Sequence, residues 1–165
     1  MNGRRISPWW KGVRGEWYVV LQALLVLLVI FGPAVLPGIP EPVSPYEWPL
    51  LAVGGSLIAA GIILAIAGTF SLGKNLTPLP HPKSDAVFIR TGAYRLVRHP
   101  IYSGIIFIAF GWAFWLQSIP KTCYALILLI FFDIKSRREE RWLEEKFLAY
   151  SDYKRRVRKL IPFLY

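Results

Sequence analysis

Long apolar blocks alternate with polar segments along this chain of 165 residues. The apolar runs extend over residues 17–36, 50–72, 101–118 and 120–135. About 20 consecutive apolar residues are needed for a helix to cross the hydrocarbon layer of a bilayer. The pattern therefore predicts an all-α fold, a polytopic transmembrane helical bundle with four spans, in one domain over residues 1–165.

The polar segments after the second and fourth runs have different character. Residues 73–100 form a long connection whose first half alternates prolines with other residues, which favours extended chain. Residues 136–157 repeat large apolar side chains, including Trp142, Leu143 and Phe147, at three- and four-residue spacing, which is typical of an amphipathic helix. We expect this helix to lie along the inner membrane surface, which makes five helices if it is counted.

The second and fourth runs carry further information. In residues 50–72 many positions are small, and Gly61 and Ala65 have the spacing that lets membrane helices approach closely, so tight packing against another helix is expected. The fourth run is uninterrupted only from Thr122 to Phe132. Either its helix extends to residues 133–135, or it lies beside a thinned or aqueous region. Asp133 is then a functional candidate or an ordinary interfacial aspartate.

Charge distribution predicts the orientation. The chain has 20 Lys+Arg and 10 Asp+Glu, a net charge of +10. Residues 37–49 carry no Lys or Arg, whereas residues 1–16, 73–100 and the C-terminal segment carry nearly all of them. Because basic residues favour the cytoplasmic side, both termini and the 73–100 loop are expected there.

A basic soluble protein of this charge would suggest a nucleic-acid partner. Here the basic residues flank the apolar runs, so membrane lipids are the expected counter-charge and no nucleic-acid partner is expected. The first run is too long for a typical signal peptide and is expected to be retained. We expect an integral membrane protein of a prokaryotic inner (plasma) membrane. The single cysteine, Cys123, excludes an internal disulfide and a Cys-rich metal site, and no metal site is predicted.

Polar and ionisable side chains are concentrated in residues 92–104, GAYRLVRHPIYSG, where the third run begins. Tyr94, Arg98, His99 and Tyr102 bring hydrogen-bonding groups to the edge of a hydrophobic helix. Desolvating such groups is costly unless they pair with each other or with a ligand. The segment therefore predicts a polar ligand at the membrane boundary. The alternative is a solvated loop whose arginines contact lipid phosphates.

A second cluster follows the fourth run. Glu139 and Glu140 lie among arginines in a segment expected on the same membrane face as residues 73–100. By itself this pattern indicates a salt-bridged surface helix. A cation-rich loop and an acid-rich helix at one membrane face also favour a shared site.

Taken together, five short motifs carry a family resemblance. They occur in the order NLTPLP, GAYRLVRHPIYSG, EERWL, Tyr-x-x-Tyr and IPF, between residues 72 and 163. In these the chain resembles the isoprenylcysteine carboxyl methyltransferase and phospholipid methyltransferase superfamily of integral membrane enzymes. Two positions depart from the family pattern: Ala93 stands where the family often has proline, and Leu148 where many members have glycine.

The resemblance implies S-adenosylmethionine-dependent methyl transfer to a lipophilic acceptor at the cytoplasmic membrane face. The acceptor, which would come from the bilayer, remains open between an isoprenylcysteine-like carboxylate, a phospholipid amine, and a smaller lipophilic acid, amine or thiol. The implied cofactor-binding residues are Tyr94, Leu96, Val97, Arg98, His99, Tyr102, Glu139 and Glu140. The residues expected nearest the acceptor, and hence catalytic, are Arg98, Glu140 and Arg137. His99 is expected to hydrogen-bond the cofactor, with general-base catalysis as the second reading.

Two other functions fit parts of the sequence. Membrane sterol reductases, which use NADPH, share an Arg-His-Pro-x-Tyr stretch, although they are usually longer. A non-enzymatic protein that binds anionic lipid would account for the charge, but it leaves the His-Pro loop and the paired glutamates without a role.

Overall fold

The computed structural model describes residues 15–38 and 47–165, and in these residues the fold is all-α, as predicted. The helices are α1 (Glu16–Phe31), α2 (Glu47–Leu72), α3 (Pro100–Trp115), α4 (Ile119–Lys146) and α5 (Tyr150–Arg156), with two short 3-10 helices, η2 (Gly73–Asn75) and η3 (Gly92–Arg95). The described part contains no strand, only an isolated parallel bridge between Val97 and Arg158. Residues 1–14 of the basic N-terminal segment, and residues 39–46 of the segment without Lys or Arg, lie outside the described residues.

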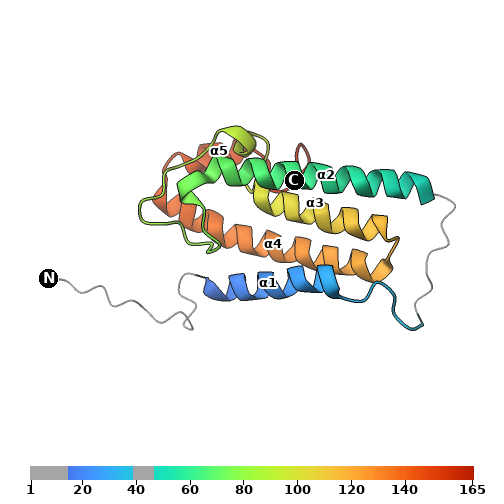
Figure 1. Cartoon of the computed structure of the whole chain (residues 1–165). Helices are drawn as coiled ribbons and strands as arrows, with labels where there is room; N and C mark the ends of the chain where they lie inside the picture. The colour runs from blue at the N-terminus through green and yellow to red at the C-terminus, as the bar shows by residue number, and fades with distance from the viewer. Residues whose placement is uncertain (1–14, 39–46) are drawn as a thin grey trace.

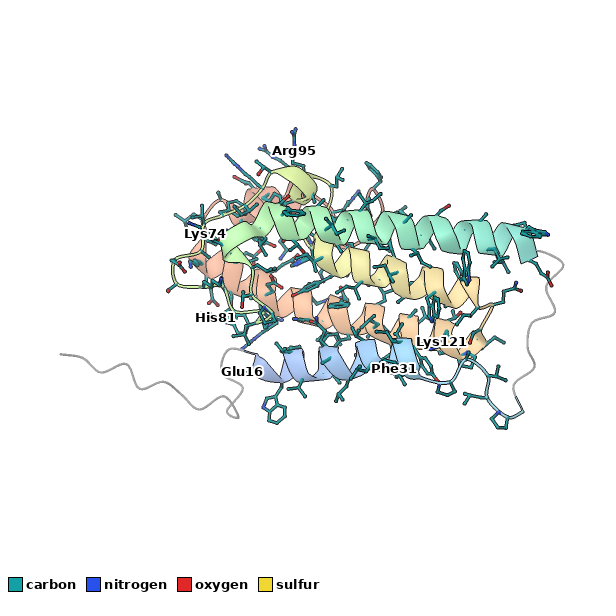
Figure 2. The ribbon with its side chains drawn as sticks, viewed as in Figure 1. Glu16, Phe31, Lys74, His81, Arg95 and Lys121 are labelled. Carbon is teal, nitrogen blue, oxygen red and sulfur yellow. The ribbon has the colours of Figure 1, made fainter. Side chains whose placement is uncertain are left out.

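The four long helices lie side by side as a row (Figure 1). Helix α2 packs against α3, α3 against α4, and α4 against α1. Helix α1 therefore does not lie beside α2, the helix that follows it in sequence. Helix α5, η3 and the 73–99 connection gather at one end of this row. The labelled polar residues Glu16, Lys74, His81 and Arg95 lie at the same end (Figure 2).

Close packing of α2 and α3 depends on glycine pairs, which confirms the tight contact expected for the second apolar run. A Cβ added at Gly61 would lie 2.6 Å from the Gly104 carbonyl oxygen, and one added at Gly104 would lie 2.5 Å from that of Gly61. Gly54 and Gly111 oppose each other in the same way, at 2.8 and 2.6 Å. Small residues let helix backbones touch, which strengthens van der Waals packing where no hydrophobic effect drives association.

Only one helix in the described residues, α2 continued through η2 (Glu47–Asn75), is both long and apolar enough to cross a membrane. Helices α1 and α3 are shorter apolar helices of 16 residues each, so the four predicted spans are not established by length and composition. Helix α1 ends at Phe31, earlier than predicted, since Gly32 and Pro33 follow. Pro100 starts α3 at a position where its missing N–H costs nothing.

Helix α4 corrects the predicted boundary near residue 135. It runs without interruption over 28 residues, from Ile119 to Lys146, so residues 136–157 do not form a separate surface helix. Residues 121–146 contain neither glycine nor proline, and nothing breaks the backbone hydrogen bonds where the side chains change from apolar to charged. The break comes at residues 147–149, before the short α5.

Asp133 lies where α4 changes character and holds the C-terminal segment. Its Oδ1 accepts hydrogen bonds from Lys159 Nζ at 2.5 Å and Tyr165 Oη at 2.8 Å. Its Oδ2 lies 2.7 Å from Arg137 Nη2. These contacts give Asp133 a structural role.

Candidate functional site

The segment before α3 is held by the C-terminal segment through main-chain hydrogen bonds. Arg98 N donates to Arg158 O at 2.8 Å, and His99 N donates to Lys159 O at 3.2 Å. With the Val97–Arg158 bridge, these bonds make residues 97–99 and 158–159 a short parallel pairing. The His-Pro loop and the C-terminal segment are therefore one structural unit.

The Arg98 side chain joins three parts of this unit. Its Nε donates to Glu140 Oε1 at 2.8 Å, and its Nη1 donates to the carbonyl oxygens of Lys154 and Val157 at 2.8 and 2.7 Å. Those carbonyls belong to the C-terminal end of α5, where a cation is favourable. Arg98 therefore links the loop to both α4 and α5.

His99 and Glu140 form the buried centre of the site. His99 Nε2 lies 3.1 Å from Glu140 Oε1, and Lys154 Nζ lies 3.5 Å from Glu140 Oε2. Burial alone would raise the pKa of the Glu140 carboxyl, but the hydrogen bond and charge of His99, followed by those of Arg98, lower it to about 2. Glu140 therefore stays ionised near neutral pH. Lys154 also pairs with Glu144 at 3.0 Å, which offsets the repulsion expected between Glu140 and Glu144.

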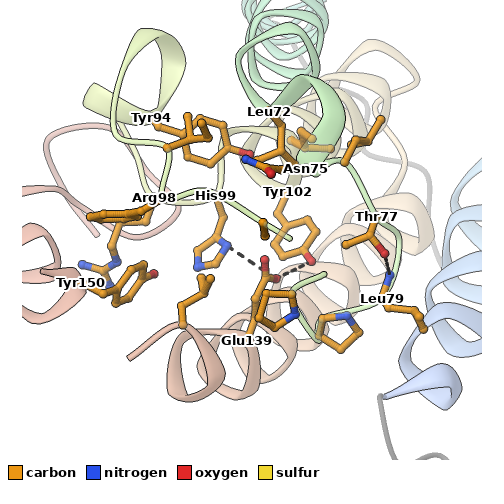
Figure 3. A pocket seen from close by; sticks show the side chains of 18 of the residues that line it. Leu72, Asn75, Thr77, Leu79, Tyr94, Arg98, His99, Tyr102, Glu139 and Tyr150 are labelled. Carbon is orange, nitrogen blue, oxygen red and sulfur yellow. Dashed lines mark hydrogen bonds and ion pairs between the residues drawn. The ribbon is translucent and has the colours of Figure 1, made fainter. Parts of the chain in front are cut away.

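Glu139 faces a different set of groups, as Figure 3 shows. Tyr102 Oη donates to Glu139 Oε2 at 2.7 Å, and His99 Nδ1 is 3.9 Å from the same oxygen. The rings of His99 and Tyr102 are stacked with centroids 5.3 Å apart, and Phe132 stacks against Tyr102 at 4.6 Å. The two adjacent glutamates thus lie on either side of His99.

These polar groups line one part of a cavity of about 320 Å³, a size within the range of small-molecule sites. Its walls come from α1, the end of α2, the 75–89 loop, η3, α3, α4 and α5. The lining residues are Gln22, Leu72, Asn75, Leu76, Thr77, Pro78, Leu79, Pro80, Pro82, Ala86, Val87, Phe88, Ile89, Tyr94, Arg98, His99, Ile101, Tyr102, Lys135, Glu139, Leu143, Phe147, Tyr150 and Tyr153. Most of this surface is apolar.

Aromatic rings form the wall beside Arg98. Phe88 stacks on Phe147 with ring centroids 5.5 Å apart and contacts the rings of Tyr150 and Tyr153. Tyr153 Oη donates to Tyr94 O at 2.6 Å. Burial, followed by the charge of Glu139, raises the pKa of the Tyr94 hydroxyl above its ordinary value, so it stays protonated.

Tyr150 has a buried hydroxyl without a partner. Its side chain lines the cavity and is only 2% exposed, yet its Oη makes no hydrogen bond within the described part of the chain. Burial, followed by the charges of Glu140 and Glu139, raises the pKa of this hydroxyl. A buried hydroxyl left unpaired is costly, so a ligand atom in the cavity is its natural partner.

The 75–89 loop closes the cavity on the side facing α1 and α4. The Asn75 side chain makes two hydrogen bonds with the backbone of Val87. Its Nδ2 donates to the Val87 carbonyl oxygen at 2.9 Å, and its Oδ1 accepts from the Val87 amide at 3.1 Å. Lys146 Nζ donates to the carbonyls of Lys83 and Ser84. The predicted extended, ordered connection is therefore a wall of the cavity.

A buried lysine faces the cavity at its α1 end. Lys135 is 1% exposed, and its Nζ donates to Gln22 Oε1 at 2.5 Å and to Pro78 O at 3.2 Å. The same nitrogen lies 5.0 Å from the centre of the Tyr102 ring. Arg98, His99, Tyr102 and Lys135 thus form a series of polar groups from the α5 side of the cavity to α1.

The structure brings five of the predicted site residues to the cavity: Tyr94, Arg98, His99, Tyr102 and Glu139. Glu140 lies behind them, bonded to Arg98 and His99. The other three do not line the cavity. Leu96 is 51% exposed, Val97 is buried with Leu64 and Ala93, and Arg137 has a largely exposed side chain bonded to Asp133. Residues 96–97 turn away because their backbone follows η3 into the pairing with Arg158.

Arg137 lines a second, more polar hollow on the other side of Arg98 and Glu140. This groove has a volume of about 460 Å³, and most of its lining residues are basic. They are Arg98, Arg137, Glu140, Lys154, Arg155, Arg156, Val157, Arg158, Lys159 and Tyr165. Arg98 is thus in contact with both hollows.

Several residues at the cavity were not predicted from the sequence. Tyr150 and Tyr153 form the Tyr-x-x-Tyr motif, which marked them without indicating which way they face. Phe88 lies in the 73–100 connection, and its sequence context did not indicate that it faces a ligand. Lys135 had a signal in the sequence, since a lysine at the inner end of an apolar run must find a partner or a ligand when it is buried.

Comparisons with known proteins point to methyltransferases. The family model for phospholipid methyltransferase matches residues 50–149. Methanethiol S-methyltransferase 1 of Bradyrhizobium diazoefficiens is 30% identical over 186 residues, which cover 99% of this chain and 61% of that protein. The chain therefore spans less than two thirds of that relative's length.

Two further relatives carry isoprenylcysteine in their names. A probable protein-S-isoprenylcysteine O-methyltransferase of Oryza sativa subsp. indica is 28% identical over 167 residues, covering 99% of this chain and 85% of the relative. Protein-S-isoprenylcysteine O-methyltransferase of Saccharomyces cerevisiae is 38% identical over 88 residues, covering 50% of this chain and 35% of the relative.

Proposed function

The chain belongs to the phospholipid methyltransferase family, and from this premise we propose that it is an integral membrane enzyme that transfers a methyl group from S-adenosylmethionine to a lipophilic acceptor at the cytoplasmic face. The relatives are named for a thiol and for isoprenylcysteine as acceptors. The acceptor of this chain would likewise be a small or lipid-like molecule that enters from the bilayer.

The observation that carries the proposal is the convergence of Arg98, His99 and Tyr102 with Glu139 and Glu140 beside one cavity. Arg98 and His99 directly precede α3 and Tyr102 lies in its first turn, whereas the two glutamates come from α4, yet hydrogen bonds of 2.7 to 3.1 Å join them. A basic surface loop that only contacts lipid would need neither the cavity nor the buried pairing.

The residues at the α5 side of the cavity fit the chemical groups of S-adenosylmethionine. The unpaired Tyr150 hydroxyl calls for a polar ligand atom, and the aromatic wall around Phe88 can enclose a purine ring. Glu139 can accept hydrogen bonds from a ribose diol or an ammonium group. His99 and Tyr94 can donate to a carboxylate or to ring nitrogens.

Methyl transfer requires alignment more than acid–base chemistry. When bound, S-adenosylmethionine supplies a methyl group on a cationic sulfur, which is open to in-line attack. The chain's own residues hold the donor, orient the acceptor and exclude water, and such positioning can account for a large part of a rate acceleration. His99, which is hydrogen-bonded to Glu140, is a cofactor ligand in this proposal; general-base catalysis is its second possible role.

The three residues expected nearest the acceptor, Arg98, Glu140 and Arg137, have different roles in this proposal. Arg98 and Glu140 use their hydrogen-bonding groups on each other, on His99 and on the end of α5, so they act as positioning residues. Arg137 contacts Asp133 in the basic groove, away from the cavity.

Calorimetric titration of S-adenosylhomocysteine into the detergent-purified protein tests the cofactor site. Removing a charged or hydrogen-bonded partner is expected to weaken binding by about 10-fold or more in His99→Ala and Glu140→Ala. Glu144→Ala is a matched control, because this glutamate is on the same helix but pairs with Lys154 rather than with Arg98 and His99. Unchanged affinity in both site variants would count against this assignment.

The same detergent-purified protein can be used to test the two alternative functions, a sterol reductase and a lipid-binding protein. Oxidation of NADPH in the presence of a sterol would indicate a reductase. Binding to anionic vesicles with no affinity for S-adenosylhomocysteine would favour the non-enzymatic lipid-binding protein.

A further inference from the structure

Three lysines are buried in the described part of the chain: Lys121, Lys135 and Lys159. Lys121 Nζ donates to the carbonyls of Val29 and Ile30, at the end of α1, where a cation is favourable. Lys159 is paired with Asp133 at 2.5 Å. Local structure therefore accounts for two of the three.

Lys135 has neither a helix C-terminus nor a paired carboxylate as its partner. Its Nζ contacts the neutral oxygens of Gln22 and Pro78 and the face of the Tyr102 ring, and no carboxylate in the described residues lies within ion-pair distance. An ammonium group has three N–H donors, and only two are used here. The charge of Glu139, one turn along α4, acts on this ammonium group without forming an ion pair with it. Burying a cation without a bonded counter-charge is costly, so an anion supplied by a ligand would stabilise this arrangement.

The position of Lys135 shows which ligand it would meet. It lines the cavity at the end formed by α1, whereas Arg98 and Tyr150 line the end formed by α5. In Figure 3, Tyr102 and Glu139 lie between Arg98 on one side and Leu79, near α1, on the other. Because the proposed cofactor uses the α5 end, the α1 end is left for the acceptor. Helix α1 exposes large apolar side chains such as Leu21 and Leu24, as a helix beside lipid does.

We propose that Lys135 selects a methyl acceptor whose nucleophile is an anion, a carboxylate or a thiolate, over one that carries a cationic amine. The inference rests on the proposed methyltransferase function and names the substrate class of the same site. Glu139, one turn along α4 from Lys135, is already hydrogen-bonded to Tyr102 and does not take the place of the acceptor anion.

The chemistry of transfer agrees with this choice. An acceptor carboxylate oxygen uses a lone pair to form a bond to the methyl carbon, and the carbon–sulfur bond breaks with its electron pair left on sulfur. An anion and a sulfonium cation thus give a neutral ester and a neutral thioether, and no proton moves. A thiolate reacts in the same way to give a thioether. An ammonium acceptor would first have to lose a proton.

The test compares farnesylated acceptors whose terminal groups differ in charge. N-Acetyl-S-farnesylcysteine carries a carboxylate, its primary amide is neutral, farnesyl thiol supplies the thiol, and farnesylamine supplies the cationic amine. For the wild-type protein in nanodiscs, binding of the acid and of the amide is measured alongside radiolabelled methyl transfer to all four. We expect the acid to bind about 10-fold or more tightly than the amide, because a buried charged hydrogen bond contributes more than a neutral one.

Lys135→Met should remove this preference. We expect kcat/KM for the acid to fall about 10- to 100-fold, mainly through KM, with the acid and the amide then binding alike. Lys135→Arg should restore part of the preference for the acid. Lys121→Met is the matched control, a buried lysine of the same helix far from the cavity, and it should leave the preference unchanged.

Titration of S-adenosylhomocysteine into each variant separates the possible failures. If the wild-type protein neither binds it nor transfers methyl groups, the proposed function itself is wrong. If wild type binds it but shows no preference for the acid over the amide, or methylates farnesylamine as well as the acid, the role of Lys135 is overturned. A parallel loss of S-adenosylhomocysteine affinity in Lys135→Met would assign Lys135 to the cofactor and also overturn the proposal. The wild-type comparison remains decisive if Lys135→Met does not fold.

Discussion

At the scale of single residues, Arg98 determines how the site is held together. Its guanidinium donates to a carboxylate on α4 and to two carbonyl oxygens at the end of α5, while its own amide pairs with Arg158. A lysine, with a single nitrogen, could not reach these separate acceptors in the same fixed geometry. The identity of residue 98 therefore matters beyond its charge.

Replacing the Glu140 carboxylate should destabilise the protein because Arg98, whose side chain is 10% exposed, would lose its counter-charge. We expect Glu140→Gln to lower the free energy of unfolding in detergent by about 3 kcal/mol at neutral pH. Glu144→Gln removes a half-exposed partner of Lys154 and should cost less than about 1 kcal/mol. Equal losses in the two variants would contradict the central role of Glu140.

The pKa of Glu140 also predicts how stability depends on pH. Its folded-state value, about 2, lies below the ordinary value of 4.5, so its contribution is fully present above pH 4.5 and is lost as the pH falls toward 2. Thermal unfolding between pH 7 and pH 3 should show this loss in the wild-type protein. Glu140→Gln should have a flatter profile, and a parallel decline in both proteins would be the contrary result.

Residue types explain which site residues could be predicted from the sequence. Arg98, His99, Tyr102 and Glu139 stand out because polar groups beside an apolar helix need partners. The partners of Arg98 in the C-terminal segment did not stand out, because they are backbone carbonyls and carry no mark of residue identity. Leu96 and Val97 were expected at the ligand because the family resemblance covers the motif that contains them, and a motif does not show where each side chain points.

At the scale of elements, α4 connects the row of long helices to the site. Its first half packs between α1 and α3, and its second half carries Lys135, Glu139 and Glu140. The sequence shows the change in polarity along this segment but not its continuity, because amphipathic spacing after residue 135 fits a new helix as well as a continued one. The uninterrupted backbone fixes the glutamates relative to the bundle.

The glycine contact between α2 and α3 gives a prediction for these two elements. In Gly61→Ala the new Cβ would lie 2.6 Å from a backbone oxygen, which must move, and we expect a loss of about 1–3 kcal/mol in the free energy of unfolding. Gly55→Ala is the control on the same helix, since its Cβ would meet only the Trp115 ring at 3.3 Å. Differential scanning calorimetry of the two variants in the same detergent makes the comparison. Equal midpoints of thermal unfolding would show that the close approach of α2 and α3 is not needed for stability.

At the scale of the whole molecule, the sequence predicted helices and a shared site but not the order of the row. Helices that are apolar on most of their surface show no preferred face, so the pairing of α1 with α4 rather than α2 had no signal in the pattern. The charge pattern did predict that the 73–100 loop and the segment after α4 lie at one end, where the cavity is.

If each of the four long helices crosses a membrane, the two ends of the row lie on opposite sides of it, and cysteine labelling can test this. In a Cys123→Ser background, Ile119→Cys lies at the start of α4 and Ser151→Cys in α5, both at exposed positions. A membrane-impermeant maleimide added to sealed vesicles should label one of them, and vesicles of the opposite orientation should label the other. Labelling of both from one side would contradict the four-span arrangement.

The pairing of residues 97–99 with residues 158–159 also bears on how the protein is made. Chains emerge from the ribosome from their N-terminus onward, so α2 and α3 can associate while the partners of Arg98 have not yet been synthesised. During that interval the guanidinium has neither Glu140 nor the carbonyls of α5. Helices α2 and α3 can thus pack together before the partners of the Arg98 guanidinium exist, and the pairing of residues 97–99 with residues 158–159 forms only after residue 159 has been synthesised.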